Sequence, residues 1–305
     1  MVRRLVILFV FIFIVVSITV WWRTPGVPIR NSIVFIGEPT VIVSWDTKRS
    51  QYVILTIPSD IRLEALHGYG SYSIASLWKL DMLEKRHGSL FLPSLVENFT
   101  IPIQWHSIHE KTVGITNEEI VQFVKGQLSL VSLLRSVVVR SSSLTLIDMV
   151  RVWLATRAID ASSTGIFDFR SRLIGTEMSF PDGSRAVQFD QKTYDGIVGD
   201  IFGSVEIRKD AIRLAIYNTT SMLGIGSRVA RVIEQLGGYI VFVGNDDVLY
   251  DGLCELTGTK ERLISTTSKV IQSLYGCTDV EPSEILRGDL ILRLGKLFEK
   301  RYLPY

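Results

Sequence analysis

The stretch Ile212–Asp246, IRLAIYNTTSMLGIGSRVARVIEQLGGYIVFVGND, predicts a strand–loop–helix–strand unit. Its first residues alternate with the period of two that is typical of a strand. A Gly-containing loop then leads into an amphipathic helix that Gly237 and Gly238 end. A second apolar run, Tyr239–Val243, predicts a buried strand before a polar turn. This βαβ unit indicates an α/β fold.

A βαβ unit with glycines near its helix raises the question of dinucleotide binding. The fingerprint for that function places its first glycine at the end of the first strand, so that the pyrophosphate meets the helix N-terminus. Here six residues separate Tyr217 from Gly224, and Val229 stands at the third glycine position. A GxxxxGK[ST] loop is also absent from the sequence. The spacing argues against a nucleotide site, although Asp246 lies roughly where a ribose-binding acid would be.

The same segment resembles the C-terminal domain of LytR-CpsA-Psr envelope proteins, the LytR_C domain. That domain has a strand ending in LNGTG, a helix with an ARVAxxLxxxGF rhythm, and a strand ending near VGN. This chain reads IYNTT, LGIGSRVARVIEQLGGY and VFVGND. A strand at Leu253–Thr257, a helix at Lys260–Tyr275 and a strand at Asp289–Leu294 fit the remainder. The resemblance implies a small, βαβ-containing LytR_C-like domain over residues 205–305, a binding or scaffolding module that faces the cell envelope.

Overall charge gives no sign of a nucleic-acid partner. The chain of 305 residues has 33 Lys and Arg against 31 Asp and Glu, a net charge of +2. No basic cluster is interleaved with aromatic residues, which is the usual footprint of a nucleic-acid binder. We therefore expect no nucleic acid among its partners.

The N-terminal segment predicts a membrane anchor. Residues 5–22, LVILFVFIFIVVSITVWW, would form a helix about 27 Å long, close to the ~30 Å hydrocarbon core. Arg3 and Arg4 favour a cytoplasmic N-terminus, and Trp21 and Trp22 suit the far interface. A cleaved signal peptide is the alternative, but no small-x-small site precedes Arg23. We expect a signal anchor at residues 1–24, a single-pass protein of the cell membrane, and an extracytoplasmic location for the rest.

Outside the cytosol a disulfide is permitted, and the chain has two cysteines. Cys254 starts a predicted strand, and Cys277 follows the helix that returns antiparallel to it. This arrangement brings both residues to the same end of the unit, within the Cα separation that a bridge requires. The alternative is two unlinked, buried thiols.

Residues 25–140 predict another α/β module. Thr40–Trp45 and Gln51–Ile57 form a predicted hairpin, and helices are expected at Ile74–Leu83 and Leu90–Asn98. The order resembles the catalytic module of the same family, with its IPRD, GYG…KIN, VE and GIPID motifs. The corresponding pieces are IPSD at 57–60, GYG at 68–70, VEN at 96–98 and IPI at 101–103. The resemblance implies transfer of glycopolymers from a lipid-pyrophosphate carrier to peptidoglycan, with arginines on the pyrophosphate and acidic residues on magnesium.

Departures from these motifs argue against catalysis. The arginine of IPRD is Ser59, and the KIN turn is Ser73-Ile74-Ala75. The family's later arginine-rich run has no counterpart that aligns. Asp60 alone remains as a candidate catalytic or metal-binding residue. A site that works by electrostatic preorganisation should lose most of its rate when several charges are removed.

Other candidate site residues are few. His106 and His109 form an HxxH pair beside Glu110, but no third ligand is placed for zinc. The aromatic residues that could stack on sugar rings are Tyr69, Tyr72, Trp78 and Trp105, each of which also suits a core position. No cofactor is expected, and magnesium enters only under a transferase function.

Residues 141–204 are interpreted as a connection made of a helix at Leu144–Ile159, a hairpin between Met178–Phe180 and Ala186–Phe189, and a short helix. The whole pattern predicts a membrane-anchored envelope protein with two extracytoplasmic α/β modules. Its expected role is binding, scaffolding or regulation in envelope assembly, without catalysis. The alternative is a divergent transferase that attaches lipid-pyrophosphate-linked glycopolymers to the cell wall. Two arginines and a second carboxylate within reach of Asp60 would favour that alternative, and Arg62 and Arg86 are the nearest candidates for the arginines.

Overall fold

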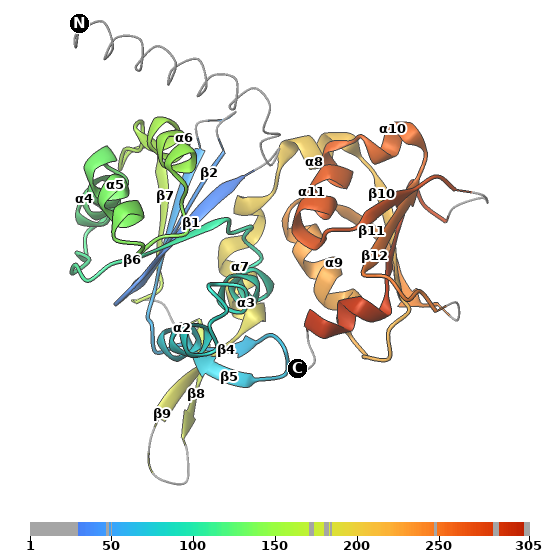
Figure 1. Cartoon of the computed structure of the whole chain (residues 1–305), viewed down its shortest axis with the longest axis horizontal. Coiled ribbons are helices and arrows are strands. Elements are labelled where there is room, and N and C mark those ends of the chain that lie inside the picture. The colour runs from blue at the N-terminus through green and yellow to red at the C-terminus, as the bar shows by residue number, and fades with distance from the viewer. Residues whose placement is uncertain are drawn as a thin grey trace, which may run out of the picture.

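The computed structural model contains three β-sheets in two modules (Figure 1). It describes residues 30–46, 49, 51–170, 174–179, 183, 185–246, 249–282 and 287–301. We refer to residues 30–204 as the first module and to residues 205–301 as the second module.

A five-stranded mixed sheet forms the centre of the first module, in the order β6-β1-β2-β3-β7. β1, β2 and β3 form an antiparallel meander, whereas β6 pairs parallel with β1 and β7 pairs parallel with β3. Nearly every side chain of β1–β3 is buried, because both faces of the sheet are covered. The strands are β1 (Asn31–Ile36), β2 (Thr40–Asp46), β3 (Gln51–Ile57), β6 (Trp105–Ile108) and β7 (Thr164–Asp168).

Helices cover both faces of this sheet (Figure 1). One face packs against α4 (Asn117–Gln127), α5 (Leu130–Val138) and α6 (Leu146–Thr156). Capping boxes at Thr116 and Thr145 fix where α4 and α6 begin. The other face packs against α2 (Ile74–Leu83), α3 (Phe91–Phe99) and α7 (Gln191–Val198), which is followed by the 3-10 turn η1 (Gly199–Phe202).

A smaller sheet extends the first module, in the order β5-β4-β9-β8. β8 and β9 form a hairpin that projects from the body of the module (Figure 1). β9 joins β4 through the pairing of Arg62 with Gln188. The strands are β4 (Arg62–Ala65), β5 (Gly70–Ser73), β8 (Gly175–Ser179) and β9 (Arg185–Phe189).

The second module is a five-stranded sheet, β11-β10-β14-β12-β13, with helices on the side that faces the first module (Figure 1). β10 and β11 are parallel and are connected by α9, so the predicted βαβ unit is confirmed. α9 ends before Gly237, whose φ of +97° is a conformation that glycine adopts without strain. The strands are β10 (Arg213–Asn218), β11 (Tyr239–Asn245), β12 (Cys254–Gly258), β13 (Thr278–Val280) and β14 (Leu290–Leu294). The helices are α8 (Val205–Asp210), α9 (Ile225–Gln235), α10 (Lys260–Leu263), α11 (Thr266–Tyr275) and the 3-10 helix η2 (Lys296–Arg301).

Arg231 of α9 fastens the two modules together. Its guanidinium makes a two-pronged ion pair with Asp195 of α7, with both N–O distances 2.7 Å. It also donates to the carbonyl oxygens of Glu97 (3.0 Å) and Asn98 (3.1 Å), at the carboxyl end of α3. One continuous apolar core runs through both modules at this junction. The modules are therefore packed as one body.

Several sequence predictions are confirmed by the structure. The hairpin at 40–57 is the antiparallel pair β2–β3, and the predicted helix Ile74–Leu83 is α2 with the same bounds. The hairpin around 180–185 is the pair β8–β9. The fold class is α/β with several sheets.

Three features differ from the sequence prediction. β11 is an edge strand with one face in solvent, since the alternating residues Tyr239, Val241 and Val243 are exposed. The helix expected over 260–275 is broken at Ser265, whose side chain caps α11. Residues 141–204 do more than connect the modules: they supply β7 and β9 to the two sheets of the first module. A period-two pattern shows which residues share a strand face but not which strand becomes its neighbour.

The predicted membrane anchor at residues 5–22 lies outside the described residues. Within the described ranges, no helix is both long and apolar enough to cross a membrane.

A disulfide joins Cys254 and Cys277, the pair that the sequence analysis singled out, with their Cα atoms 4.6 Å apart. It ties the start of β12 to the residue after α11 and its capping Gly276. The bridge therefore closes the β12–α10–α11 segment on itself.

We predict that the double variant Cys254→Ser/Cys277→Ser unfolds more easily than the parent chain. A bridge between residues 23 positions apart reduces the entropy of the unfolded chain, so its loss should cost about 3 kcal/mol. Urea unfolding of the two proteins measures this difference. Free-thiol titration of the denatured, unreduced parent is the control, and two reactive thiols there would refute the bridge.

Candidate functional site

Asp60 lies at the carboxyl end of β3, in the turn that leads to β4, and is exposed. Glu38, from the turn between β1 and β2, lies close enough to interact with it. Burial raises the pKa of Glu38 above its usual range, and the negative charge of Asp60 raises it further. The backbone N–H of Ser59 and the charge of Arg170 oppose this shift. The edge of the sheet thus carries two mutually repelling carboxyl groups and one nearby arginine.

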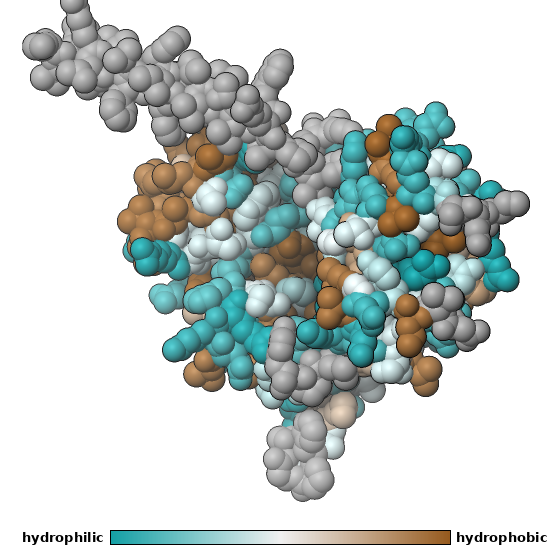
Figure 2. Space-filling view, turned by 45° about the vertical axis from the view of Figure 1, so that its right-hand side comes forward, coloured by the Kyte–Doolittle hydropathy of each residue, from teal (hydrophilic) through white to brown (hydrophobic). Residues whose placement is uncertain are grey.

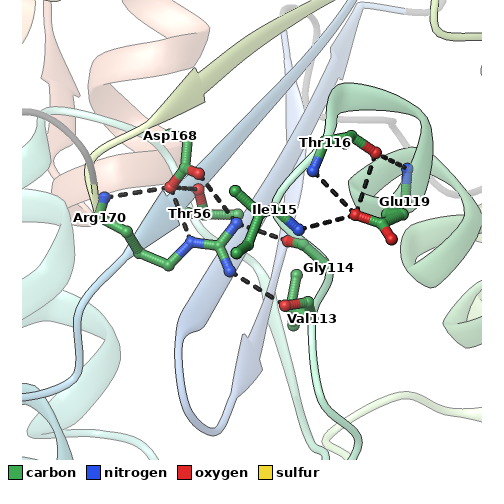
Figure 3. Close-up of polar contacts among 8 residues, drawn as sticks. All are labelled: Thr56, Val113, Gly114, Ile115, Thr116, Glu119, Asp168 and Arg170. Atoms are coloured by element: carbon green, nitrogen blue, oxygen red, sulfur yellow. Dashed lines mark hydrogen bonds and ion pairs between the residues drawn. The ribbon is translucent and has the colours of Figure 1, made fainter.

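The guanidinium of Arg170 is bound by a carboxylate and two backbone carbonyls of the fold (Figure 3). Its Nε and Nη2 atoms donate to the two carboxylate oxygens of Asp168, both at 2.9 Å. Its Nη1 donates to the carbonyl of Val113 at 3.0 Å, and its Nη2 also donates to that of Gly114 at 2.6 Å. Four of the five N–H donors of a guanidinium are thereby used.

Asp168 is the second half of this arrangement (Figure 3). Burial pushes the pKa of Asp168 upward, but hydrogen bonds from Arg170 and from the hydroxyl of Thr56 outweigh it and hold this pKa below its ordinary value. The carboxylate is therefore ionised and fully engaged at neutral pH. The Arg170–Asp168 pair ties the end of β7 to β3 and to the loop before α4. In that loop Thr116 is the N-cap of α4, and the side chain of Glu119 accepts its backbone N–H.

Arg62 and Arg86, the two arginines considered as partners of Asp60, donate hydrogen bonds to other groups. Arg62 donates to the carbonyl of Ser71 across the β4–β5 pair. Arg86 donates to the hydroxyl of Tyr69 at 3.2 Å and lies over its ring. Within the described residues, Asp60 itself forms no ion pair. Among the residues that the structure describes, no arginine pairs with Asp60 in the way that cation forks neutralise a pyrophosphate in phosphoryl transfer.

We predict that Arg170→Gln lowers the free energy of unfolding by about 2–3 kcal/mol, because it leaves a partly buried carboxylate and two carbonyls without a charged donor. Arg213→Gln is the matched control. It removes an ion pair to Asp289 in which the arginine side chain is 57% exposed, and it should cost less than about 1 kcal/mol. Equal urea midpoints for the two variants would contradict a structural role for Arg170.

The HxxH residues are separated by the sheet. His106 packs its ring against Trp78, with ring centroids 4.9 Å apart. His109 instead lies under Gly37 and contacts the carbonyl oxygens of Pro39 and Lys111, both at 3.1 Å. Burial lowers the pKa of both rings. No cluster of three potential metal ligands occurs among the described residues.

The loop between β10 and α9 is filled by the protein's own side chains. Asn218 accepts hydrogen bonds from the N–H and the hydroxyl of Thr220. Glu299 of η2, which is buried, accepts the backbone N–H of Ser221. A carboxylate therefore occupies the position near the helix start where a nucleotide phosphate would need backbone donors.

Of the aromatic residues considered as sugar-stacking candidates, Tyr69, Tyr72 and Trp78 pack against the large core. Trp105 stacks on the buried Trp45 at a centroid distance of 6.1 Å. All four rings are half-buried and pack against the core.

A cleft of about 410 Å³ lies between the two modules. Figure 2 shows the molecule hollowed there, with apolar atoms in the recess. Its walls are mostly apolar and come from α3 and the following segment on one side and from α9 and α11 on the other. The apolar wall residues are Leu92, Pro93, Val96, Pro102, Ile103, Leu236, Val270 and Leu274. Both the volume and the lining are typical of a site for a small molecule or part of a larger one.

Two arginines, Arg30 and Arg301, line this cleft. Arg30 is only 2% exposed; its Nε donates to Ser44 at 3.0 Å and its Nη1 to the carbonyl of Ile201 at 2.9 Å. Its Nη2 is buried without a hydrogen-bond partner. Burial lowers the pKa of Arg30 to about 10, which leaves it charged at neutral pH. A buried cation with an unused donor favours an anionic ligand.

The sequence analysis did not find this site. Arg30 was not considered as a site residue, and Pro102 and Ile103 were noted only as part of the IPI motif. The only signal was a charged residue directly before the buried strand β1.

No protein-family model and no curated protein matches the sequence. The chain is similar to several solved structures. One is the LytR-CPS2A-psr family protein YwtF (TagT) of Bacillus subtilis with bound octaprenyl pyrophosphate lipid, which is 13% identical, with 57% of this chain and 90% of that chain covered and a TM-score of 0.37. Another is B. subtilis TagV, which is 9% identical, with 55% and 93% covered and a TM-score of 0.39. A protein described as a transcriptional regulator from Enterococcus faecalis is 12% identical, with 71% and 92% covered and a TM-score of 0.40.

These likenesses concern the fold alone and assign no role to any residue of this chain. The resemblance of residues 212–246 to the LytR_C domain stays a prediction.

Proposed function

We propose that the chain is a membrane-anchored, extracytoplasmic protein of the cell envelope that binds an envelope component without catalysing its transfer. The observation that carries the absence of catalysis is the engagement of Arg170. A transferase needs its arginine donors free for the phosphate oxygens, whereas here four donors hold Asp168 and the loop at 113–114.

The cleft between the modules supports the binding role. It combines apolar walls with the buried charge of Arg30 and the guanidinium of Arg301. This chemistry fits an anionic molecule with an apolar part. Binding at such a cleft requires no reaction of the ligand.

A divergent transferase is the second candidate, because one observation favours it. Glu38 and Asp60 are close enough for the charge of one to raise the pKa of the other. A carboxylate pair of this kind is able to hold a magnesium ion through oxygen ligands. The same edge would then act on a lipid-pyrophosphate-linked glycopolymer.

Turnover separates the two functions. We predict that the full chain, in detergent with magnesium and a pyrophosphate-linked polyprenyl donor, releases no polyprenyl phosphate above the level without protein. The reason is that Asp60 forms no ion pair within the described part of the chain, so no cation is paired there that could neutralise charge in the transition state. Release that is abolished by Asp60→Ala would refute the scaffold function and establish the transferase.

We also predict that the full chain is retained by purified cell wall and that filling the cleft reduces this retention at least about tenfold. Ser273→Trp places a large ring into the cleft from an exposed position of α11 and should leave folding intact. Arg30→Gln should weaken retention in the same direction through loss of the buried charge. Arg213→Gln, an arginine outside the cleft, is the matched control. Retention that is unchanged in both cleft variants would exclude the cleft as the binding site.

A further inference from the structure

The helices α5 and α6 present an unusual amount of apolar side chain to solvent. α5 has the sequence LVSLLRSVV, and only Leu133 of it is buried. Val131 and Val138, one face of this helix, are 78% and 71% exposed. Together with neighbouring residues of α6 they form what we call the α5–α6 face, which consists of Leu130, Val131, Leu134, Val138, Val139, Leu146, Ile147 and Leu154.

Figure 2 shows apolar surface gathered over this side of the first module. α5 and α6 pack against each other, so their exposed residues lie on one continuous surface. Soluble monomers rarely leave a contiguous apolar patch of this extent uncovered. An exposed apolar face of this kind is typical of an interaction surface.

The segment that carries the α5–α6 face has an excess of positive charge. Residues 130–157 contain four arginines, Arg135, Arg140, Arg151 and Arg157, and a single acid, Asp148. That acid is engaged in the capping box of Thr145. The nearby Asp160 is paired with Lys125 at 3.9 Å. An apolar helical face with a cationic rim is typical of helices that lie on an anionic lipid surface.

The path of the chain brings this face close to a membrane. The apolar run ends at Trp22, and seven residues, 23–29, lead to Arg30 and β1. Fully extended, they span at most about 25 Å. The carboxyl end of α6 lies at the same end of the central sheet as Asn31, the first residue of β1. Tyr52 pairs with Trp45, which pairs with Asn31. The hydroxyl of Tyr52 donates to the carbonyl of Ala155 in α6.

We infer that the α5–α6 face lies on the outer surface of the bilayer, with its aliphatic side chains at the headgroup boundary and its arginines on lipid phosphates. This inference rests on the proposed membrane anchor at residues 5–22. A second copy of the chain fits the face less well. In a symmetric dimer the same patch meets itself, and the arginine rims of the two copies would repel each other.

Spin-label accessibility tests the inference on the full chain in vesicles of phosphatidylethanolamine and phosphatidylglycerol. The two native cysteines form a disulfide, so a nitroxide reagent attaches only to an introduced thiol. Val138→Cys is the test site. Leu83→Cys, at an equally exposed apolar position (81%) at the end of α2, is the matched control.

We expect the ratio of oxygen to nickel-chelate accessibility to be at least about fivefold higher at 138 than at 83, because oxygen concentrates in lipid and the chelate stays in water. The double variant Arg135→Gln/Arg140→Gln should reduce the difference in this accessibility ratio between positions 138 and 83. Equal ratios at the two sites would overturn the inference. The inference would also be overturned if the label at 138 were shielded from both reagents and chemical cross-linking gave dimers. A second copy of the chain would then cover the face.

Alkaline carbonate washing of the same vesicles separates this inference from the proposed function. A chain that resists the wash and shows no contrast at 138 refutes only the placement of the α5–α6 face. A chain that is washed off refutes the membrane anchor itself.

Discussion

The guanidinium of Arg231 makes the most extensive polar contact between the two modules, beside the apolar core that they share. It donates to two carbonyls at the carboxyl end of α3, where the helix dipole is negative, and pairs with Asp195 of α7 through two bonds of 2.7 Å. Its side chain is 19% exposed, so the interaction is weakly screened by water. Because α3 forms one wall of the cleft and α9 the other side, the width of the cleft follows from this contact.

The same contact gives the VEN segment at 96–98 a structural role. In the VEN segment at 96–98, Val96 lines the cleft, and Glu97 and Asn98 give their carbonyls to Arg231. The side chain of Asn98 also donates to the carbonyl of Glu64 in β4. These residues hold elements in place, a role that does not depend on a reactive group. A sequence motif can thus be retained for the packing of a scaffold.

Local patterns predicted the elements well, and long-range pairing less well. The strand pair β2–β3, the helix α2 and the βαβ unit follow from alternation, capping residues and glycines within a few residues of each other. The parallel pairing of β7 with β3 joins residues more than 100 positions apart, and no local signal specifies it. Asp60 was placed correctly after a strand. The partners of Arg170 were unpredictable, since Val113 and Gly114 contribute backbone carbonyls, which every residue has.

Arg170 and Arg30 lie at opposite ends of the central sheet. Their hydrogen-bond partners determine whether each charge only stabilises the fold or keeps an unused donor. Arg170 stands where β7 ends, and its donors are taken by Asp168 and the chain before α4, so its charge stabilises the fold. Arg30 stands before β1, lines the cleft and keeps a buried Nη2 without a hydrogen-bond partner, so the fold leaves one of its donors unused. The carboxylates Glu38 and Asp60 lie a full strand length away from Arg30, at the other end of the sheet. The distribution of satisfied and unsatisfied donors, more than the number of arginines, favours binding over transfer.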